Sequence, residues 1–180
     1  MLSNVEMILL SLVVEKPSYA YEIDKQIQAR DMRCWVKVGV ASIYQVLERL
    51  ANKGYLYSER EQEGKMPPRS RYFLTPTGRE ALREAVRSRL AKLEWFYLDL
   101  SLGLEGGDCL DRAELAACLR TRRKEAHRNL SGLIRMQKEA FNHQGGYDKK
   151  NAVATVLFGF RQAEISILDQ LLAILEKETT

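Results

Sequence analysis

Apolar residues recur every three or four positions in three short segments near the start of the chain, a spacing that predicts three amphipathic helices. The first segment, 5–13, stops before Pro17, whose ring cannot continue a helix. Ser18 can cap a second helix that ends near residue 30. The third helix is predicted over 41–53, and Gly54 follows it at the position where a left-handed residue commonly ends a helix.

The pattern changes directly after this third helix. Residues 55–60 and 69–74 have the composition of two strands, and Gly64 and the Pro67-Pro68 pair break the chain between them. The sequence therefore predicts a two-stranded hairpin with a long, charged tip.

The chain after the hairpin is predicted to be helical. Thr77 and Glu80 have the spacing of a capping box, so we expect a fourth helix to start there and to continue past residue 97. Its apolar stripe alternates spacings of three and four, as in a coiled-coil seam. The stripe consists of Leu82, Val86, Leu90, Leu93, Tyr97 and Leu100.

Two further helices complete the chain. Asp111 and Glu114 form a second box-like start, which predicts a helix to about residue 142. A last helix is predicted from about Val153 almost to the end of the sequence. The predicted fold class is mainly α, with one domain over 1–80 and a helical domain over 81–180.

Composition and charge exclude several classes of protein. The chain has 180 residues, of which 46% are hydrophobic, enough for a packed core. Its 28 basic and 24 acidic side chains leave a net charge of +4, which is compatible with nucleic-acid binding. Its three cysteines lie far apart without a metal-binding pair, and we find no catalytic or phosphate-loop motif. We expect a cytoplasmic protein without membrane spans, enzymatic activity, metal or cofactor.

Three helices followed by a two-stranded hairpin is the order of elements in a winged helix-turn-helix domain. In that fold the third helix enters the major groove of DNA, where polar side chains opposite its apolar stripe approach the base edges. Ser42, Gln45 and Arg49 occupy this outward face. The amide group of Gln45 can make a bidentate contact with adenine.

The hairpin, or wing, carries the basic residues Lys65, Arg69 and Arg71, which we expect to contact phosphates or an adjacent minor groove. Over 60–71 there are four basic and two acidic side chains, a net charge of +2. A dimer would double that charge, and each phosphate that it neutralises releases a counterion. We therefore expect useful affinity for DNA only from a homodimer.

Several motifs together resemble the PadR-like family of bacterial transcriptional regulators, over essentially the whole chain. They are Tyr21-Glu22-Ile23, Ser42-Ile43-Tyr44, Leu47-Glu48-Arg49-Leu50, Lys53-Gly54 and the stretch 69–78, RSRYFLTPTG. The resemblance implies a winged domain followed by a helical dimerisation domain, as in the larger subgroup of the family. It also implies a repressor that binds a near-palindromic operator in double-stranded DNA.

The resemblance assigns DNA contacts to Ser42, Tyr44 and the basic residues of the wing, with the hydroxyl of Tyr44 on a phosphate. The sequence departs from the family pattern at two positions. Ala20 stands where the family usually has glycine, and Gln45 stands where proline is frequent. Gln45 can therefore shift the preferred operator sequence.

Two features of the C-terminal half have two interpretations each. Trp95, Phe96 and Tyr97 are either a site for an aromatic or amphipathic effector, as the resemblance suggests, or part of the core or a dimer interface. The stretch 120–138 has seven basic residues and one acidic residue. It either contacts nucleic acid or forms a solvated helix face paired with acidic residues of the last helix, and we favour the second interpretation.

Two alternatives concern other parts of the chain. Cys109 and Cys118 are either sensitive to oxidation or simply small buried residues, and burial is the commoner case. The winged domain can also serve as an adaptor that binds a protein partner instead of DNA. The basic residues of the wing favour DNA.

Overall fold

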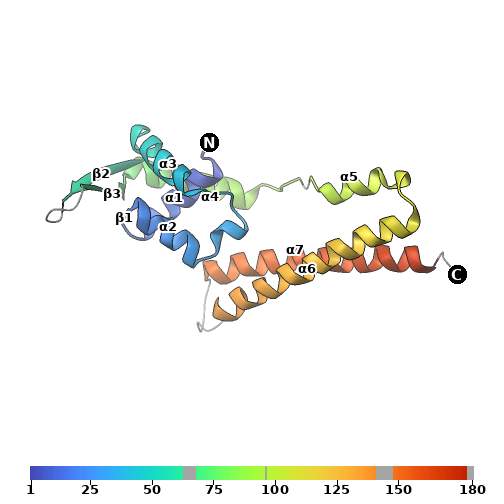
Figure 1. The fold of residues 1–180 in the computed structure, drawn as a ribbon. Helices are drawn as coiled ribbons and strands as arrows, with labels where there is room; N and C mark the ends of the chain where they lie inside the picture. Colours follow the sequence, from blue (N-terminus) through green and yellow to red (C-terminus); the bar gives the residue numbers. More distant parts are fainter. Residues whose placement is uncertain (63–67, 96, 141–147, 178–180) are drawn as a thin grey trace. The chain divides into compact units, whose positions relative to one another are not determined.

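The structure is a computed structural model that describes residues 1–62, 68–95, 97–140 and 148–177 (Figure 1). The chain separates into two compact units, Met1–Trp95 and Phe96–Thr180. In its described part, the first unit combines helices with a small sheet, and the second contains only helices. The mainly helical fold with an N-terminal winged unit confirms the predicted fold class.

The first helix of the chain, α1 (Asn4–Glu15), begins with a capping box. The hydroxyl of Ser3 accepts a hydrogen bond from the backbone N–H of Glu6 at 3.2 Å, and the Glu6 carboxylate accepts one from the N–H of Ser3 at 2.8 Å. These bonds satisfy backbone donors that a helix start leaves without partners. The helix ends before Pro17, as its sequence predicts.

The second helix, α2 (Ala20–Ala29), starts later than predicted, because Tyr19 is its capping residue. The Glu22 carboxylate accepts a hydrogen bond from the backbone N–H of Tyr19 at 3.0 Å. Ser18 is buried, and its hydroxyl donates to the carbonyl of Lys16. The prediction that Ser18 caps this helix is wrong, because Ser18 belongs to a strand.

That strand, β1 (Ser18–Tyr19), adds a third member to the expected hairpin of β2 (Leu56–Glu61) and β3 (Arg69–Leu74). The sheet is antiparallel with the order β1-β3-β2. Tyr19 lies opposite Arg71, and Arg71 lies opposite Glu59 on the other side. Two residues of strand are too few for hydrophobic alternation to reveal, so the sequence did not predict β1.

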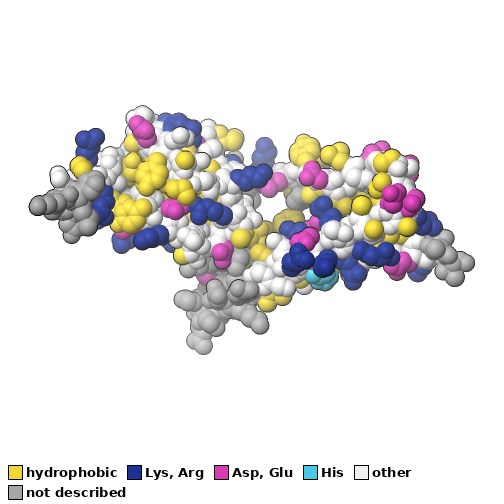
Figure 2. All heavy atoms as spheres, in the orientation of Figure 1, with side chains coloured by type: hydrophobic (Ala, Val, Ile, Leu, Met, Phe, Trp, Pro, Cys, Tyr) yellow, Lys and Arg dark blue, Asp and Glu magenta, His cyan; other side chains and the backbone are white. Residues whose placement is uncertain are grey.

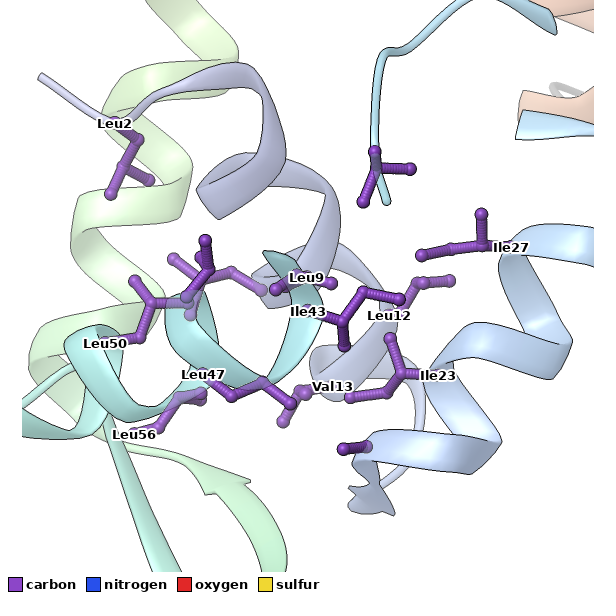
Figure 3. Close-up of a cluster of buried hydrophobic side chains, with 14 of the residues drawn as sticks. Leu2, Leu9, Leu12, Val13, Ile23, Ile27, Ile43, Leu47, Leu50 and Leu56 are labelled. Atoms are coloured by element: carbon purple, nitrogen blue, oxygen red, sulfur yellow. The ribbon is translucent and has the colours of Figure 1, made fainter. Parts of the chain in front are cut away.

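The core of the first unit forms where α1, α2 and α3 (Val40–Asn52) meet. A short 3-10 helix, η1 (Met32–Cys34), precedes α3. Leu9, Ile23 and Ile43 come from the three helices, have no exposed surface and point toward one another (Figure 3). Burying each such side chain contributes about 2 kcal/mol. After α3, Gly54 has a φ of 72°, the left-handed conformation that its position predicts.

The fourth helix, α4 (Pro76–Ala91), differs from its prediction at both ends. Its capping residue is Thr75, whose hydroxyl accepts from the N–H of Gly78 at 2.9 Å, so a box at Thr77 is wrong. Pro76 occupies the first turn, where its missing N–H costs nothing. A Cβ on Gly78 would lie 2.1 Å from the carbonyl oxygen of Tyr55, so this close approach requires glycine.

The chain leaves the helical path after Ala91, and the continuous helix expected to residue 100 is not formed. A separate short helix, α5 (Asp99–Glu105), follows. A 3-10 helix, η2 (Gly107–Cys109), comes next. The stripe from Leu82 to Leu100 therefore does not form one seam.

The second unit is built around two long helices, α6 (Arg112–Ala140) and α7 (Lys149–Lys177), which pack side by side (Figure 1). Asp111 and Glu114 form the predicted capping box at the start of α6. Leu119 and Leu168 are buried between the helices. No helix in the described ranges is both long and apolar enough to cross a membrane.

Ion pairs also join α6 to α7. They are Arg120 with Glu176 at 3.1 Å, Arg122 with Glu164 at 2.7 Å, and Arg123 with Asp169 at 2.7 Å. These pairs support the interpretation of Arg120, Arg122 and Arg123 as part of a solvated face paired with the last helix, whereas Arg128 pairs with Glu125 on α6 itself.

Candidate nucleic-acid interface

The outward face of α3 is fixed by what the helix buries. Four apolar side chains at helical spacing hold it to α1 and α2. They are Ile43, Val46, Leu47 and Leu50. Tyr44 and Gln45 point away from that core and are exposed, Tyr44 by 52%. Ser42, also predicted to face outward, is only half exposed because it lies at the edge of the buried stripe.

Tyr44 lies where α3 meets the wing. Burial raises the pKa of the Tyr72 hydroxyl on β3, and the nearby Glu48 and Tyr44 raise it further. These two neighbours belong to adjacent turns of the exposed face of α3. Glu48 and Tyr44 of α3 therefore lie near Tyr72 of β3.

Arg49 is on the exposed side of α3, and it shares one buried carboxylate with Lys53. Its Nε lies 3.3 Å from Oε1 of Glu6, and Nζ of Lys53 lies 2.7 Å from the same oxygen. The Glu6 side chain is 4% exposed, so both cations converge on a buried carboxylate of α1. This arrangement ties the last turns of α3 to the start of α1.

The ionisation of Glu6 follows from these contacts. Burial by itself raises the pKa of this carboxyl, but hydrogen bonds from Lys53 and Ser3 and the charge of Lys53 outweigh burial and lower the pKa to about 2. Glu6 is therefore ionised at neutral pH. Removing its charge would leave two cations at the end of α3 without their partner.

In the wing, Arg71 of β3 is held by three groups. Its Nε lies 3.3 Å from Oε1 of Glu61, and its Nη2 donates to the Tyr19 hydroxyl at 3.0 Å. The guanidinium also lies over the Tyr19 ring, 4.7 Å from the ring centre. The Tyr19 hydroxyl in turn donates to Glu61, and this bond is the main reason that its pKa is raised. These contacts connect all three strands.

A second tyrosine extends this arrangement onto α2. The rings of Tyr19 and Tyr21 stack with their centres 5.6 Å apart and their planes 13° apart. Nζ of Lys25 and the guanidinium of Arg69 lie 5.5 Å and 5.9 Å from the centre of the Tyr21 ring. We call these five residues, Tyr19, Tyr21, Lys25, Arg69 and Arg71, the tyrosine–cation cluster.

Sequence reasoning found two members of this cluster, Arg69 and Arg71, and missed the other three. The spacing of Tyr21 and Lys25, four residues apart, places them on one face of α2 and was an available signal. The strand that carries Tyr19 to the wing left no such signal. Figure 2 shows hydrophobic side chains bordered by dark-blue basic ones where β1, β3 and α3 lie.

The remaining predicted site residues are not brought into one site. Lys65 of the wing and Phe96 lie outside the described residues. Trp95 and Tyr97 are 85% and 92% exposed and belong to the non-helical segment between α4 and α5. A hollow of about 520 Å³ between α6 and α7 has a charged and polar lining that includes none of the three aromatic residues.

The cysteines differ from their expected burial. Cys109, in η2, and Cys118, on α6, are both exposed. Cys34, in η1, is exposed as well. In the described ranges, no group of His, Cys, Asp and Glu side chains could hold a metal ion.

Residues 9–84 match the Transcriptional regulator PadR-like family, a family of regulators and not of enzymes. None of the curated proteins matches the chain.

Solved structures of similar fold cover almost the whole chain. Bacillus subtilis PadR in complex with operator DNA has a TM-score of 0.82 and 16% identity, over 96% of this chain and 99% of that one. The same protein in complex with p-coumaric acid has a TM-score of 0.78 and 16% identity, over 98% and 99%. The PadR-like regulator BC1756 from Bacillus cereus has a TM-score of 0.71 and 18% identity, over 97% and 99%. At these identities the similarity establishes the fold of both units.

Proposed function

Because residues 9–84 match the PadR-like family of transcriptional regulators, we propose that this chain is a member of that family, binds operator DNA as a homodimer and represses transcription. The observation that carries the proposal is the outward face of α3. The apolar face of α3 is buried in the core, while Tyr44 and Gln45 on its opposite face are exposed, and Tyr44 lies near Tyr72 of the wing. This is the arrangement in which a recognition helix enters the major groove and an adjacent hairpin follows the backbone.

The proposal gives the exposed residues different roles. Gln45, near the middle of the exposed face, contacts a base edge, and Ser42 contacts DNA from the margin of that face. The hydroxyl of Tyr44 reaches a phosphate. The wing residues Arg69, Arg71 and Lys65 follow the backbone or the adjacent minor groove. Arg49 approaches DNA only by leaving Glu6, so its contribution is smaller than its position in the sequence implies.

A stripe on α7 supports the homodimer. Four apolar side chains at spacings of four, seven and seven residues remain 48–56% exposed on this helix. They are Val156, Phe160, Ile167 and Ile174. They do not coincide with the residues that α7 buries against α6, such as Leu168 and Leu172. A heptad stripe of this kind is typical of a helix that packs against a second helix. In a homodimer, the second copy of the chain provides that helix.

We also propose control by a small aromatic or amphipathic effector. The support is the p-coumaric acid complex of Bacillus subtilis PadR, a protein of the same fold. Trp95, Tyr97 and Phe96 are the aromatic residues that we assign to this role in the dimer. An effector that binds preferentially to one spacing of the two recognition helices would release the operator.

Selection from random double-stranded DNA tests the function directly. The full-length protein should enrich a near-palindromic site whose halves lie about one helical turn apart. Reversing both wing charges with Arg69→Glu and Arg71→Glu should abolish binding while the circular dichroism spectrum is retained. The matched control, Lys124→Glu with Arg128→Glu on α6, should bind normally. No enrichment by the wild-type protein would instead favour the adaptor function.

The dimer has its own test. Phe160→Glu places a charge in the exposed stripe of α7 and should convert the protein to a monomer in light scattering coupled to size exclusion. Gln162→Glu adds the same charge to α7 outside the stripe and should leave the dimer intact. A dimer that persists in Phe160→Glu would overturn the assignment of this stripe.

A further inference from the structure

We propose that the tyrosine–cation cluster is a second contact with the DNA backbone, in which Lys25 is the principal phosphate ligand. The inference rests on the proposed function and adds a binding site that lies on α2, outside the recognition helix. It assigns the residues Tyr21 and Lys25 to the DNA interface. Its ligand is a phosphate group of double-stranded DNA.

The cations around the wing differ in how far carboxylates compensate their charge. Arg71 is paired with Glu61 at 3.3 Å and bonded to Tyr19, so much of its charge is compensated within the domain. Arg49 is similarly paired with Glu6. Lys25 differs from both, because it is exposed and forms an ion pair with no acidic side chain in the described part of the chain. Of these three cations, Lys25 therefore has the charge most available to a phosphate.

Lys25 is held in place by an aromatic surface. Its ammonium lies 5.5 Å from the centre of the Tyr21 ring, and that ring is stacked on Tyr19. Tyr19 is bonded to Arg71 and Glu61 of the wing. A cation placed over an aromatic ring keeps its hydrogen-bond donors while its position is restrained. The lysine thus loses less freedom when it binds a phosphate than an isolated surface lysine does.

The position of the tyrosine–cation cluster between α2 and the wing also favours a contact with phosphate. Arg69 also lies over the Tyr21 ring, at 5.9 Å, so the cluster bridges α2 and the first residue of β3. In a helix-turn-helix the helix before the recognition helix crosses the DNA backbone. With α3 in the major groove, α2 and Arg69 at the start of β3 face the flanking phosphates. A cation shared by α2 and the wing would fix how both approach that strand.

The experiment measures salt dependence with the full-length protein and the duplex that wild-type protein selects. A lost phosphate contact reduces the slope of log Kobs against log[salt] by about 0.9, hence by about 2 for the two subunits of a dimer. Lys25→Gln should show this reduced slope and weaken binding about fivefold on matched and mismatched duplexes alike. Lys25→Arg should restore both values, and Tyr21→Leu should lose part of the affinity.

The control variant is Lys124→Gln, which removes the same charge from an exposed position on α6 and should change neither value. A wild-type slope in Lys25→Gln, alongside weakened binding by Gln45→Ala, would overturn the inference and leave the proposed function standing. Failure of the wild-type protein to bind any duplex would overturn the proposed function, and this inference with it.

Discussion

Glu6 is the one buried acidic side chain in the described core of the winged unit, and it makes the strongest prediction about stability. Glu6→Gln preserves the shape of the side chain and one acceptor for the capping bond to Ser3. It removes the charge that Lys53 and Arg49 approach at 2.7 Å and 3.3 Å. Lowering the pKa from 4.5 to about 2 corresponds to about 3 kcal/mol of stability, since each unit represents about 1.4 kcal/mol.

Because both cations are about half exposed, we expect Glu6→Gln to reduce the free energy of unfolding by about 2 to 3 kcal/mol at pH 7. The sign of the pH dependence follows from linkage. A group whose pKa is lowered by folding stabilises the fold above its unfolded pKa, and this contribution is lost as the pH falls through the folded pKa. The difference between wild type and variant should therefore be constant above about pH 5 and shrink toward pH 2.

Urea denaturation followed by tryptophan fluorescence measures this difference. The chain has two tryptophans, so a Trp95→Phe background leaves Trp35, which packs against the core of the winged unit, as the reporter. Glu84→Gln, at an exposed glutamate of α4 that is paired with Arg87 at 3.8 Å, is the matched control and should change stability by less than about 0.5 kcal/mol. An equal loss at pH 3 and pH 7 in Glu6→Gln would refute the electrostatic explanation.

Three further predictions concern the wing and its neighbours. Gly78→Ala should destabilise the winged unit by about 3 kcal/mol or more in urea denaturation, because its Cβ would lie 2.1 Å from the Tyr55 carbonyl oxygen; an unchanged midpoint would contradict that close approach. Gln45→Ala should change the selected base sequence while the salt slope stays constant, and a changed slope would show that Gln45 contacts phosphate instead. Glu61→Gln should tighten DNA binding and steepen the slope by about 1 per subunit, because Arg71 loses its compensating carboxylate; weaker binding would mean that Glu61 mainly positions Arg71.

The fold of the first unit could be predicted because its signals are local. Ile43 and Leu50 repeat at helical spacing, and Gly54 marks the end of the helix. The errors have equally specific causes. Ser18 has the chemistry of a cap, but pairing with Tyr72 places it in a strand. Such tertiary pairing overrides a local preference and cannot be read from a single sequence.

The C-terminal half shows where periodicity misleads. Leu93 and Tyr97 continue the apolar stripe of α4, yet the helix ends at Ala91 and both side chains are more than 80% exposed. An apolar stripe at helical spacing shows that a segment is suited to burial on one side. That side can be covered by a partner as well as by the rest of the chain. The division between domains at residue 80 stays a prediction, while the compact first unit extends to Trp95.

The candidate site was predicted by residue type but not by pairing. Arg49 and Arg71 are basic and near the expected interface, and both turn out to be bound to carboxylates that lie far from them in sequence or across a strand pair. The net charge of +2 over 60–71 already includes Glu61, but the sequence does not show that Arg71 is the cation that this carboxylate holds. Lys25 on α2, which forms no ion pair with any of the described residues, was not included in that count because it lies outside the hairpin.

This internal pairing changes the reason for a dimer. Under the proposed function, a cation that must leave a carboxylate to reach a phosphate gains only the difference between two similar interactions, so we expect each subunit to make few strong backbone contacts. Two subunits on one operator make the second binding event intramolecular, which multiplies modest affinities without new contacts. In the dimer that we propose, the paired arginines keep a single subunit weak on random DNA, and contact through the exposed stripe of α7 makes two weak contacts selective for a two-fold site.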